Sequence, residues 1–394
     1  MAETVRVPIS NVLTGSNFTL SIAVGAKPQL LNVMLDTGSS MLVVDGAIYD
    51  PGGDTDVATT QLLQTAQFQS GSFMAAVVRA PVGLVSGPGA PAAVLNGTNL
   101  AVTYDSRPGT FGQADGIFGL AYASLDAAYR MPADTWQNKY AADQLTLGQQ
   151  ADLDPYVNQL VAAQRVTNKF AFAVQRSVVR EALADPATDP LNGGLFVLGG
   201  GAECTDLYTG AFASVAVVHG QYYNTNLMAI QVGDRSITVP PIAPGSKAAS
   251  NSMIDSGSTN VTLDQGLYDR LIALFRAVNP DLAQALTAYA PTASTGVAQT
   301  EIDLTRWPPL RFIMQGSEGD QVPVIVQPKD YWQFDVNQAG NASPVLCGDG
   351  GMLGGQSILG LPLFAGQFVV FDRTATNGHG VIGFAAQAGS APIG

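Results

Sequence analysis

The sequence predicts a mostly β protein built from two related lobes, on the evidence of its length, its composition and an internal repeat. A chain of 394 residues is too long for one ordinary hydrophobic core and suits two lobes of roughly 200 residues each. The chain is 46% hydrophobic and 12% charged, with 43 glycines and 23 prolines. This composition favours short strands joined by many turns over long surface helices.

The repeat is an order of motifs that occurs once in each half of the chain. A Val-Gly turn, an apolar strand, an acidic loop and a second apolar strand follow one another around Asp36 and again around Asp255. Each half also has a later apolar segment ending in Gly-Leu, at residues 117–120 and 358–361, where a glycine allows close approach of another backbone. We expect lobes at residues 1–205 and 206–394, divided after the glycine-rich turn at residues 199–201.

Strands and helices can be placed from local patterns. Apolar runs at residues 18–24, 30–35 and 41–44 are separated by turn residues, so the first lobe opens as β structure. Asp154 and Pro155 form a helix start before an apolar face. A second helix is expected after Thr262, since apolar residues recur there at helical spacing.

The chemistry is carried by two short loops, Asp36-Thr37-Gly38-Ser39 and Asp255-Ser256-Gly257-Ser258, each of which directly follows an apolar strand. One such tetrapeptide is a weak signal, but one in each half of the chain is hard to obtain by accident. A carboxylate at the end of a buried strand is held rigidly, glycine permits a sharp turn, and the hydroxyls can hydrogen-bond the carboxylate or the backbone. Like charges at close range cannot both ionise, so a facing pair shares one proton and supplies both an acid and a base.

On these loops the chain resembles the pepsin family of aspartic endopeptidases, and the likeness extends to residues 115–122, 208–210, 358–360 and 368–384. The resemblance implies a bilobal fold of two β-barrel-like lobes with an active-site cleft between them, and hydrolysis of extended polypeptides at acidic pH by water alone, without a cofactor or a metal. Asp36 and Asp255 match the family's catalytic pair. The supporting loop positions are Thr37, Gly38, Ser39, Ser256, Gly257 and Ser258, and the substrate-binding positions are Phe68, Gln69, Ser70, Ile117 and Thr259.

The chain departs from the family at the flap, a hairpin that covers the cleft. The flap tyrosine is replaced by Phe68, and the tryptophan to which it commonly hydrogen-bonds is replaced by Val43. Both ends of one hydrogen bond are absent together, so neither side chain leaves an unpaired polar partner. We expect the tip of this flap to be held by apolar contact or tuned for specificity.

The start of the chain and its cysteines also differ from the family. Residues 5–10 resemble the first strand of the mature enzyme and leave no room for a basic prosegment, which suggests either a trimmed chain or a bacterial pepsin homologue. The family's usual disulfide is not expected, because Cys347 lacks its upstream partner, and a bridge from Cys204 to Cys347 is an open alternative. Four triplets fit the glycosylation pattern, but such triplets are common by chance.

Several other functions are disfavoured. A net charge of −13 with 18 lysines and arginines offers no basic surface for nucleic acid. No signal peptide or membrane-spanning run is apparent, so we expect a soluble monomer of the bacterial cytoplasm or periplasm, or a secreted mature form. The chain lacks zinc-protease and serine-hydrolase motifs. The expected partners are polypeptide substrates and pepstatin-type inhibitors, and the rival hypothesis is a binding protein that keeps the fold without turnover.

Overall fold

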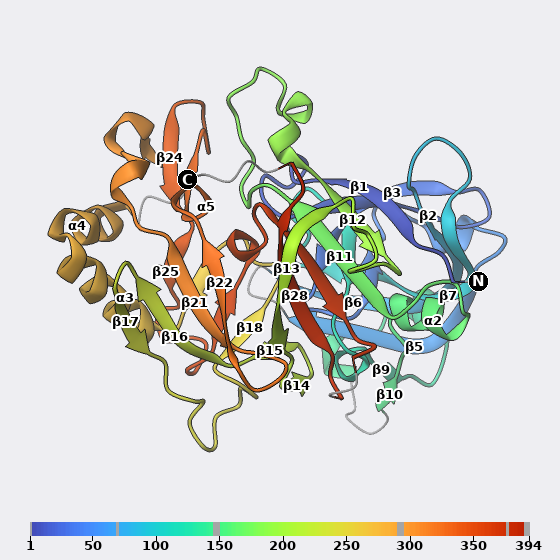
Figure 1. Ribbon diagram of the computed structural model, residues 1–394. Helices are drawn as coiled ribbons and strands as arrows, with labels where there is room; N and C mark the ends of the chain where they lie inside the picture. The colour runs from blue at the N-terminus through green and yellow to red at the C-terminus, as the bar shows by residue number, and fades with distance from the viewer. Residues whose placement is uncertain (1, 68–70, 145–149, 290–294, 376–377, 390–394) are drawn as a thin grey trace. The chain divides into compact units, whose positions relative to one another are not determined.

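The computed structural model describes residues 2–67, 71–144, 150–289, 295–375 and 378–389 (Figure 1). The predicted mostly β architecture is confirmed. The described chain divides into two compact units. Unit 1 contains residues 1–9, 18–168 and 197–199, and unit 2 contains residues 10–17, 169–196 and 200–394.

Unit 1 is built around one extended sheet with two short helices. Its strands are β1 (Val5–Ser10, whose last residue belongs to unit 2), β2 (Thr19–Val24), β3 (Gln29–Asp36), β4 (Leu42–Val44), β5 (Ala58–Gln67), β6 (Ser72–Leu84), β7 (Ala92–Ser106), β8 (Gly116–Gly119), β9 (Ala127–Arg130) and β10 (Gln150–Asp152). Its helices are α1 (Thr135–Asn138) and α2 (Tyr156–Ala162). The strand order is β10-β9-β5-β6-β7-β4-β8-β3-β2-β1.

Unit 2 contains several smaller sheets and the longer helices. Its strands are β11 (Lys169–Val174), β12 (Gly193–Leu198, whose last two residues belong to unit 1), β13 (Tyr208–Ala216), β14 (His219–Gly220), β15 (Tyr223–Thr225), β16 (Leu227–Val232), β17 (Arg235–Thr238), β18 (Ser252–Ile254), β19 (Val261–Leu263), β20 (Val297–Ala298), β21 (Leu310–Gln315), β22 (Gln321–Val326), β23 (Trp332–Phe334), β24 (Asn341–Pro344), β25 (Leu346–Gly348), β26 (Ser357–Leu359), β27 (Gln367–Asp372) and β28 (Val381–Gln387). Its helices are α3 (Gln265–Val278), α4 (Pro280–Tyr289) and α5 (Pro328–Tyr331).

The two helices predicted from sequence are confirmed. Helix α3 places Leu267, Leu271 and Phe275 on its buried face, as an amphipathic period requires. Helix α2 begins one residue later than the sequence suggests, because Pro155 is its N-cap and not its first residue.

Two segments that the expected boundary placed in the first lobe belong to unit 2. Residues 169–196, assigned from sequence to the first lobe, group with unit 2 because β11 pairs antiparallel with β27 from Lys169–Asp372 to Ala173–Phe368. Residues 10–17 also belong to unit 2, where the N–H of Asn11 donates to the carbonyl of Asn192. The limits at residues 205 and 206 therefore do not coincide with the compact units.

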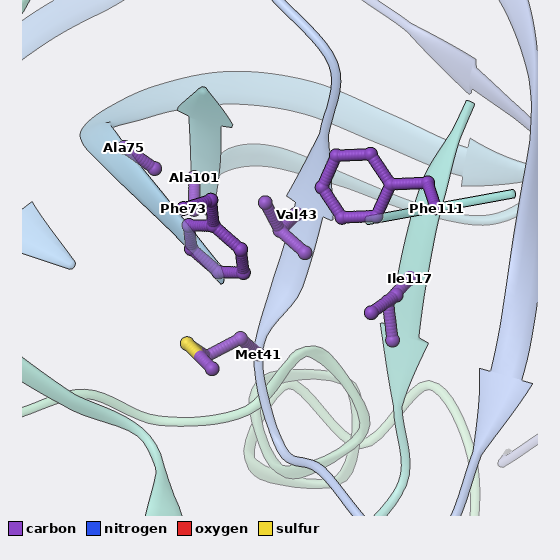
Figure 2. Close-up of a cluster of buried hydrophobic side chains, with 7 residues drawn as sticks. All are labelled: Met41, Val43, Phe73, Ala75, Ala101, Phe111 and Ile117. Carbon is purple, nitrogen blue, oxygen red and sulfur yellow. The ribbon is translucent and has the colours of Figure 1, made fainter. Parts of the chain in front are cut away.

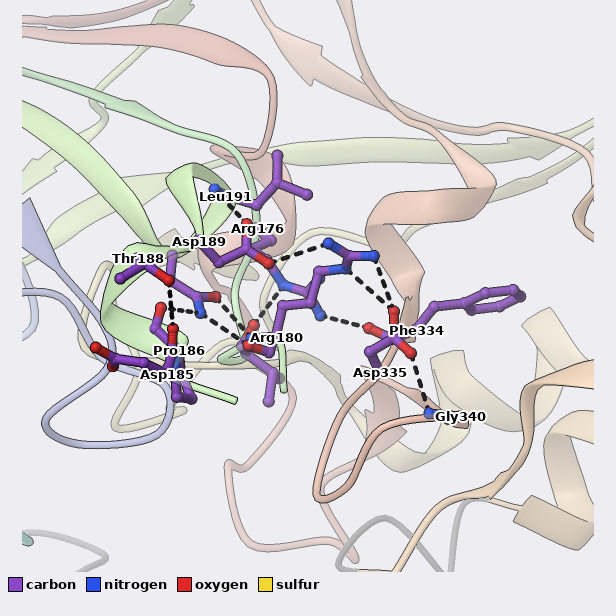
Figure 3. A network of polar contacts seen from close by, with 12 residues as sticks. Arg176, Arg180, Asp185, Pro186, Thr188, Asp189, Leu191, Phe334, Asp335 and Gly340 are labelled. Carbon is purple, nitrogen blue, oxygen red and sulfur yellow. Dashed lines mark hydrogen bonds and ion pairs between the residues drawn. The ribbon is translucent and has the colours of Figure 1, made fainter. Parts of the chain in front are cut away.

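A polar network fixes residues 176–192, which belong to the segment 169–196, within unit 2 (Figure 3). The guanidinium of Arg180 contacts Asp189 at 3.0 Å and Asp335 at 3.1 Å. Arg176, which is 7% exposed, donates to the carbonyl of Phe334 at 2.9 Å, and burial lowers its pKa to about 10. The amide of Asn192 donates to the carbonyl of Arg180 at 2.9 Å. These contacts hold residues 176–192 against the β23–β24 hairpin.

Candidate active site

The Asp36 loop of unit 1 begins where β3 ends. Strand β3 pairs in parallel with β8, with Asp36 opposite Gly119, and β4 returns antiparallel to β8 on its other side. The N–H of Gly38 donates to Oδ1 of Asp36 at 2.7 Å, and the hydroxyl of Ser39 donates to Oδ2 at 2.6 Å. Hydrogen bonds of this kind stabilise the charged form of a carboxyl group.

The Asp255 loop of unit 2 repeats this arrangement. Strand β18 pairs in parallel with β26, with Ile254 opposite Leu359, and β19 runs antiparallel to β26. The N–H of Gly257 donates to Oδ1 of Asp255 at 2.8 Å. Each predicted acidic loop therefore follows a strand that pairs in parallel with a second strand, and that second strand pairs antiparallel with a third.

Two glycines permit this construction by leaving space for backbone. A β-carbon on Gly119 would lie 2.4 Å from the carbonyl carbon of Ser40, and one on Gly360 would lie 2.2 Å from the carbonyl oxygen of Ser258. Real β-carbons do not approach other atoms so closely. The sequence predicted that another backbone approaches closely at each repeated Gly-Leu segment, and the structure confirms this. In each unit the glycine lies directly against the acidic loop.

The hydroxyls of the two loops differ. Ser39 is 4% exposed and bonds to the Asp36 carboxylate, whereas the hydroxyl of Ser258 donates to the carbonyl of Asn260 at 3.3 Å. The resemblance implied the same role for both serines.

The remaining loop positions are largely enclosed. Thr37 is 0% exposed and Ser256 is 1% exposed, so both side chains point into the protein. Gly257, Ser258 and Thr259 are half-buried. A substrate-contacting role for Thr259 stays a prediction.

Ile117, predicted to line a substrate pocket, packs in a hydrophobic cluster of unit 1 (Figure 2) and is 4% exposed. The members of this cluster are Met41, Val43, Phe73, Ala75, Ala101, Phe111 and Ile117. Val43 lies at its centre, and the rings of Phe73 and Phe111 are 6.0 Å apart. The position where the family carries tryptophan is therefore filled by aliphatic and phenylalanine side chains.

The expected flap corresponds to the hairpin of β5 and β6, which pair up to Gln67 and Ser72. Phe68, Gln69 and Ser70 lie outside the described residues, so their predicted contacts are untested. The base of the hairpin is braced where β5 departs from regular pairing with β6 between Thr59 and Leu63. There the hydroxyl of Thr135 donates to the carbonyls of Thr60 and Leu62 at 3.1 and 2.8 Å.

A residue that sequence reasoning missed contacts the second acidic loop. Asn17 belongs to the segment at residues 10–17 of unit 2, and its Nδ2 donates to the carbonyl of Gly257 at 2.7 Å. No local motif marks this contact, because 240 residues separate its partners. In the sequence Asn17 reads as a turn residue before a strand or as the start of a glycosylation triplet, and neither pattern points to Gly257.

Two carboxyl groups outside the acidic loops have strongly raised pKa values. Burial raises the pKa of Asp126 in unit 1 to about 7, opposed by the hydrogen bond from Gln64. Burial likewise raises the pKa of Asp330 in unit 2 to about 7. Both groups are neutral in acid, where their burial has little electrostatic cost.

Cys204 and Cys347 are both free thiols, so the open alternative of a bridge between them is not realised. Among the described residues, no group of three or more His, Cys, Asp or Glu side chains could hold a metal ion. Within the same part of the chain, no helix is long and apolar enough to cross a membrane.

A family model described as eukaryotic aspartyl protease matches residues 96–386, well over half of the chain. The matched range contains the Asp255 loop and both repeated Gly-Leu segments, and it begins after the Asp36 loop.

Proposed function

Because this chain belongs to the eukaryotic aspartyl protease family, and is thus a pepsin-like aspartic endopeptidase acting on polypeptides, we propose that Asp36 and Asp255 form its catalytic pair. The pair hydrolyses peptide bonds of extended polypeptides at acidic pH through an activated water molecule. The binding-protein alternative is disfavoured, because both acidic loops are complete.

The observation that carries this proposal is the matched construction of the two loops. In each unit the aspartate follows a strand paired in parallel with a second strand. In each unit the glycine two residues later donates its N–H to the aspartate Oδ1, at 2.7 Å for Asp36 and 2.8 Å for Asp255. Each carboxyl group is thereby fixed in position, as a positioned acid or base in catalysis must be.

In the proposed mechanism the two carboxyl groups share one proton. The ionised member accepts a proton from water as the water oxygen attacks the scissile carbonyl carbon, and the protonated member donates to the carbonyl oxygen. The tetrahedral intermediate then collapses with proton transfer to the leaving amine. Activity therefore falls in alkali, where the shared proton is lost. Water is the nucleophile and carboxyl groups move the protons, so we expect no cofactor.

The test is to replace each aspartate by asparagine and to measure digestion of casein or haemoglobin in acid. Asp36→Asn, Asp255→Asn and the double variant should each lose roughly a thousand-fold or more of kcat, and the double variant should lose little more than either single one, because the pair acts as a unit. Asp234→Asn, in an exposed turn, is the matched control and should keep its activity. Substantial turnover by either single variant would refute the catalytic pair.

The partners proposed for this site follow from the same chemistry. Pepstatin, which carries a hydroxyl in place of the attacked carbonyl, should inhibit the enzyme, and the altered flap should weaken its binding without abolishing it. We further expect a monomer without affinity for nucleic acid, in keeping with the net charge of −13.

A further inference from the structure

The segment at residues 10–17 makes specific contacts along its length within unit 2. Its backbone is fixed by hydrogen bonds from Asn11 to the carbonyl of Asn192 at 3.1 Å and from Val179 to the carbonyl of Gly15 at 2.9 Å. Asn192 in turn accepts the N–H of Arg180 at 2.6 Å, so the segment is anchored to the buried charge network of Figure 3. These contacts fix the backbone that leads to Asn17, the last residue of the segment.

The side chain of Asn17 is also held at both ends of its amide. The hydroxyl of Ser16 donates to Oδ1 at 3.1 Å, and Nδ2 donates to the carbonyl of Gly257 at 2.7 Å. Only the nitrogen of the amide can donate to the Gly257 carbonyl, so that contact sets the amide orientation, and the Ser16 hydroxyl can donate to the oxygen in the same orientation. Asn17 is thus pre-organised as a donor toward the Asp255 loop.

Gly257 connects this contact to the acidic group. Its carbonyl accepts from Asn17, while its N–H donates to Oδ1 of Asp255 at 2.8 Å. Glycine has wide backbone freedom, so the direction of this N–H depends on what fixes the neighbouring peptide. In the other loop a serine hydroxyl makes a second bond to the carboxylate, whereas the hydroxyl of Ser258 is directed to Asn260.

We propose that Asn17 is a positioning residue for Asp255, holding Gly257 in the orientation in which its N–H donates to the Asp255 carboxylate. This inference rests on the proposed catalytic role of Asp255. Ser39 bonds the Asp36 carboxylate directly, whereas Asn17 acts on Asp255 through Gly257. A hydrogen bond that favours the charged carboxylate extends the range of acid over which one member of the pair stays ionised.

The experiment measures kcat and KM for one peptide substrate from about pH 2 to pH 7 in the wild type and in two variants. Asn17→Ala removes the donor. It should lower kcat by about three- to ten-fold with a smaller change in KM, and move the acidic limb of the kcat profile upward by roughly half a pH unit. Asn17→Asp has nearly the same shape but can donate only while its carboxyl group is protonated. It should approach the wild type at the lowest pH and lose activity earlier than the wild type as pH rises.

The control is Asn138→Ala, which removes another asparagine amide donating to a backbone carbonyl at 2.7 Å, to Asp134 in unit 1. This variant should leave the acidic and the alkaline limbs of the pH profile of kcat unchanged. If Asn17→Ala fails to fold, the nearly isosteric Asn17→Asp decides the matter. Unchanged limbs in the folded Asn17 variants, with Asp255→Asn inactive, would overturn the positioning role alone, whereas an active Asp255→Asn would overturn the proposed function itself.

Discussion

The hydroxyl of Ser39 lies 2.6 Å from Oδ2 of Asp36 and donates a hydrogen bond to it. The equivalent hydroxyl in unit 2 donates to a backbone carbonyl instead, at 3.3 Å. The acidic loops are therefore alike in backbone and unlike in how their serines are used.

Replacing the two serines separately should expose this difference. Ser39→Ala removes a bond that favours the charged carboxylate, so the acidic limb of the kcat/KM profile should move to higher pH and kcat should fall about ten-fold. Ser258→Ala removes only a long bond to a carbonyl and should cost less than about two-fold. Parallel pH–rate profiles test the prediction, and equal losses in the two variants would contradict it.

The buried carboxyl of Asp126 should make unit 1 more stable in acid than at neutral pH. Its pKa is about 7 in the folded protein, against 3.8 for the free group. Between these values the unfolded chain releases the proton while the folded protein keeps it, so the free energy of unfolding falls as pH rises through this window and levels off above it. Asp126→Asn keeps the oxygen that accepts from Gln64 and should reduce this fall to the part that Asp330 contributes.

The measurement is denaturant unfolding at several pH values between about 4 and 8. Asp143→Asn, at an exposed position, is the matched control and should keep the pH dependence of the wild type. A wild type and an Asp126→Asn variant with the same pH dependence would show that Asp126 does not carry the effect.

Arg180 should be important for the stability of unit 2. Arg180→Met leaves Asp189, whose side chain is 2% exposed, without its charged partner. We expect a loss of about 3 kcal/mol, at the lower end for a broken buried ion pair, because Arg180 itself is 32% exposed. Arg306→Met breaks an ion pair of the same 3.0 Å length whose side chains are 51% and 72% exposed, and should cost under about 1 kcal/mol. Denaturant unfolding measures both variants. If Arg180→Met and Arg306→Met lose the same free energy of unfolding, the network has no special structural role.

Restoring the family's tryptophan at Val43 should destabilise unit 1. Val43 is 0% exposed and enclosed by its cluster, so Val43→Trp should cost about 1–3 kcal/mol through overpacking. Thermal unfolding of Val43→Trp beside Val43→Ile, which adds one methylene, checks the expectation. A tryptophan variant as stable as the wild type would mean that the cluster has room for the larger ring.

The sequence predicted the parts of the molecule that depend on local pattern. The apolar strands before Asp36 and Asp255, the repeat of Gly119 and Gly360, and helix α3 all follow from residues that are close in the chain. What it could not predict depends on pairing over long separations. Strand β11 joins unit 2 through β27, nearly 200 residues away. The contact of Asn17 has the same cause, since neither partner carries a signal that points to the other.

The contact between Asn17 and Gly257 also bears on how the enzyme should be produced. Asn17, Phe18 and Thr19 form an acceptor triplet for N-linked sugar, and the sugar is attached to the same nitrogen that donates to Gly257. A bulky glycan on that half-buried side chain would compete for the space in which Nδ2 donates to Gly257. Material from a secretory host that modifies only some chains at Asn17 would therefore be a mixture of two enzymes with different pH profiles. Mass spectrometry of the peptide containing residue 17 should precede any kinetic comparison between expression hosts.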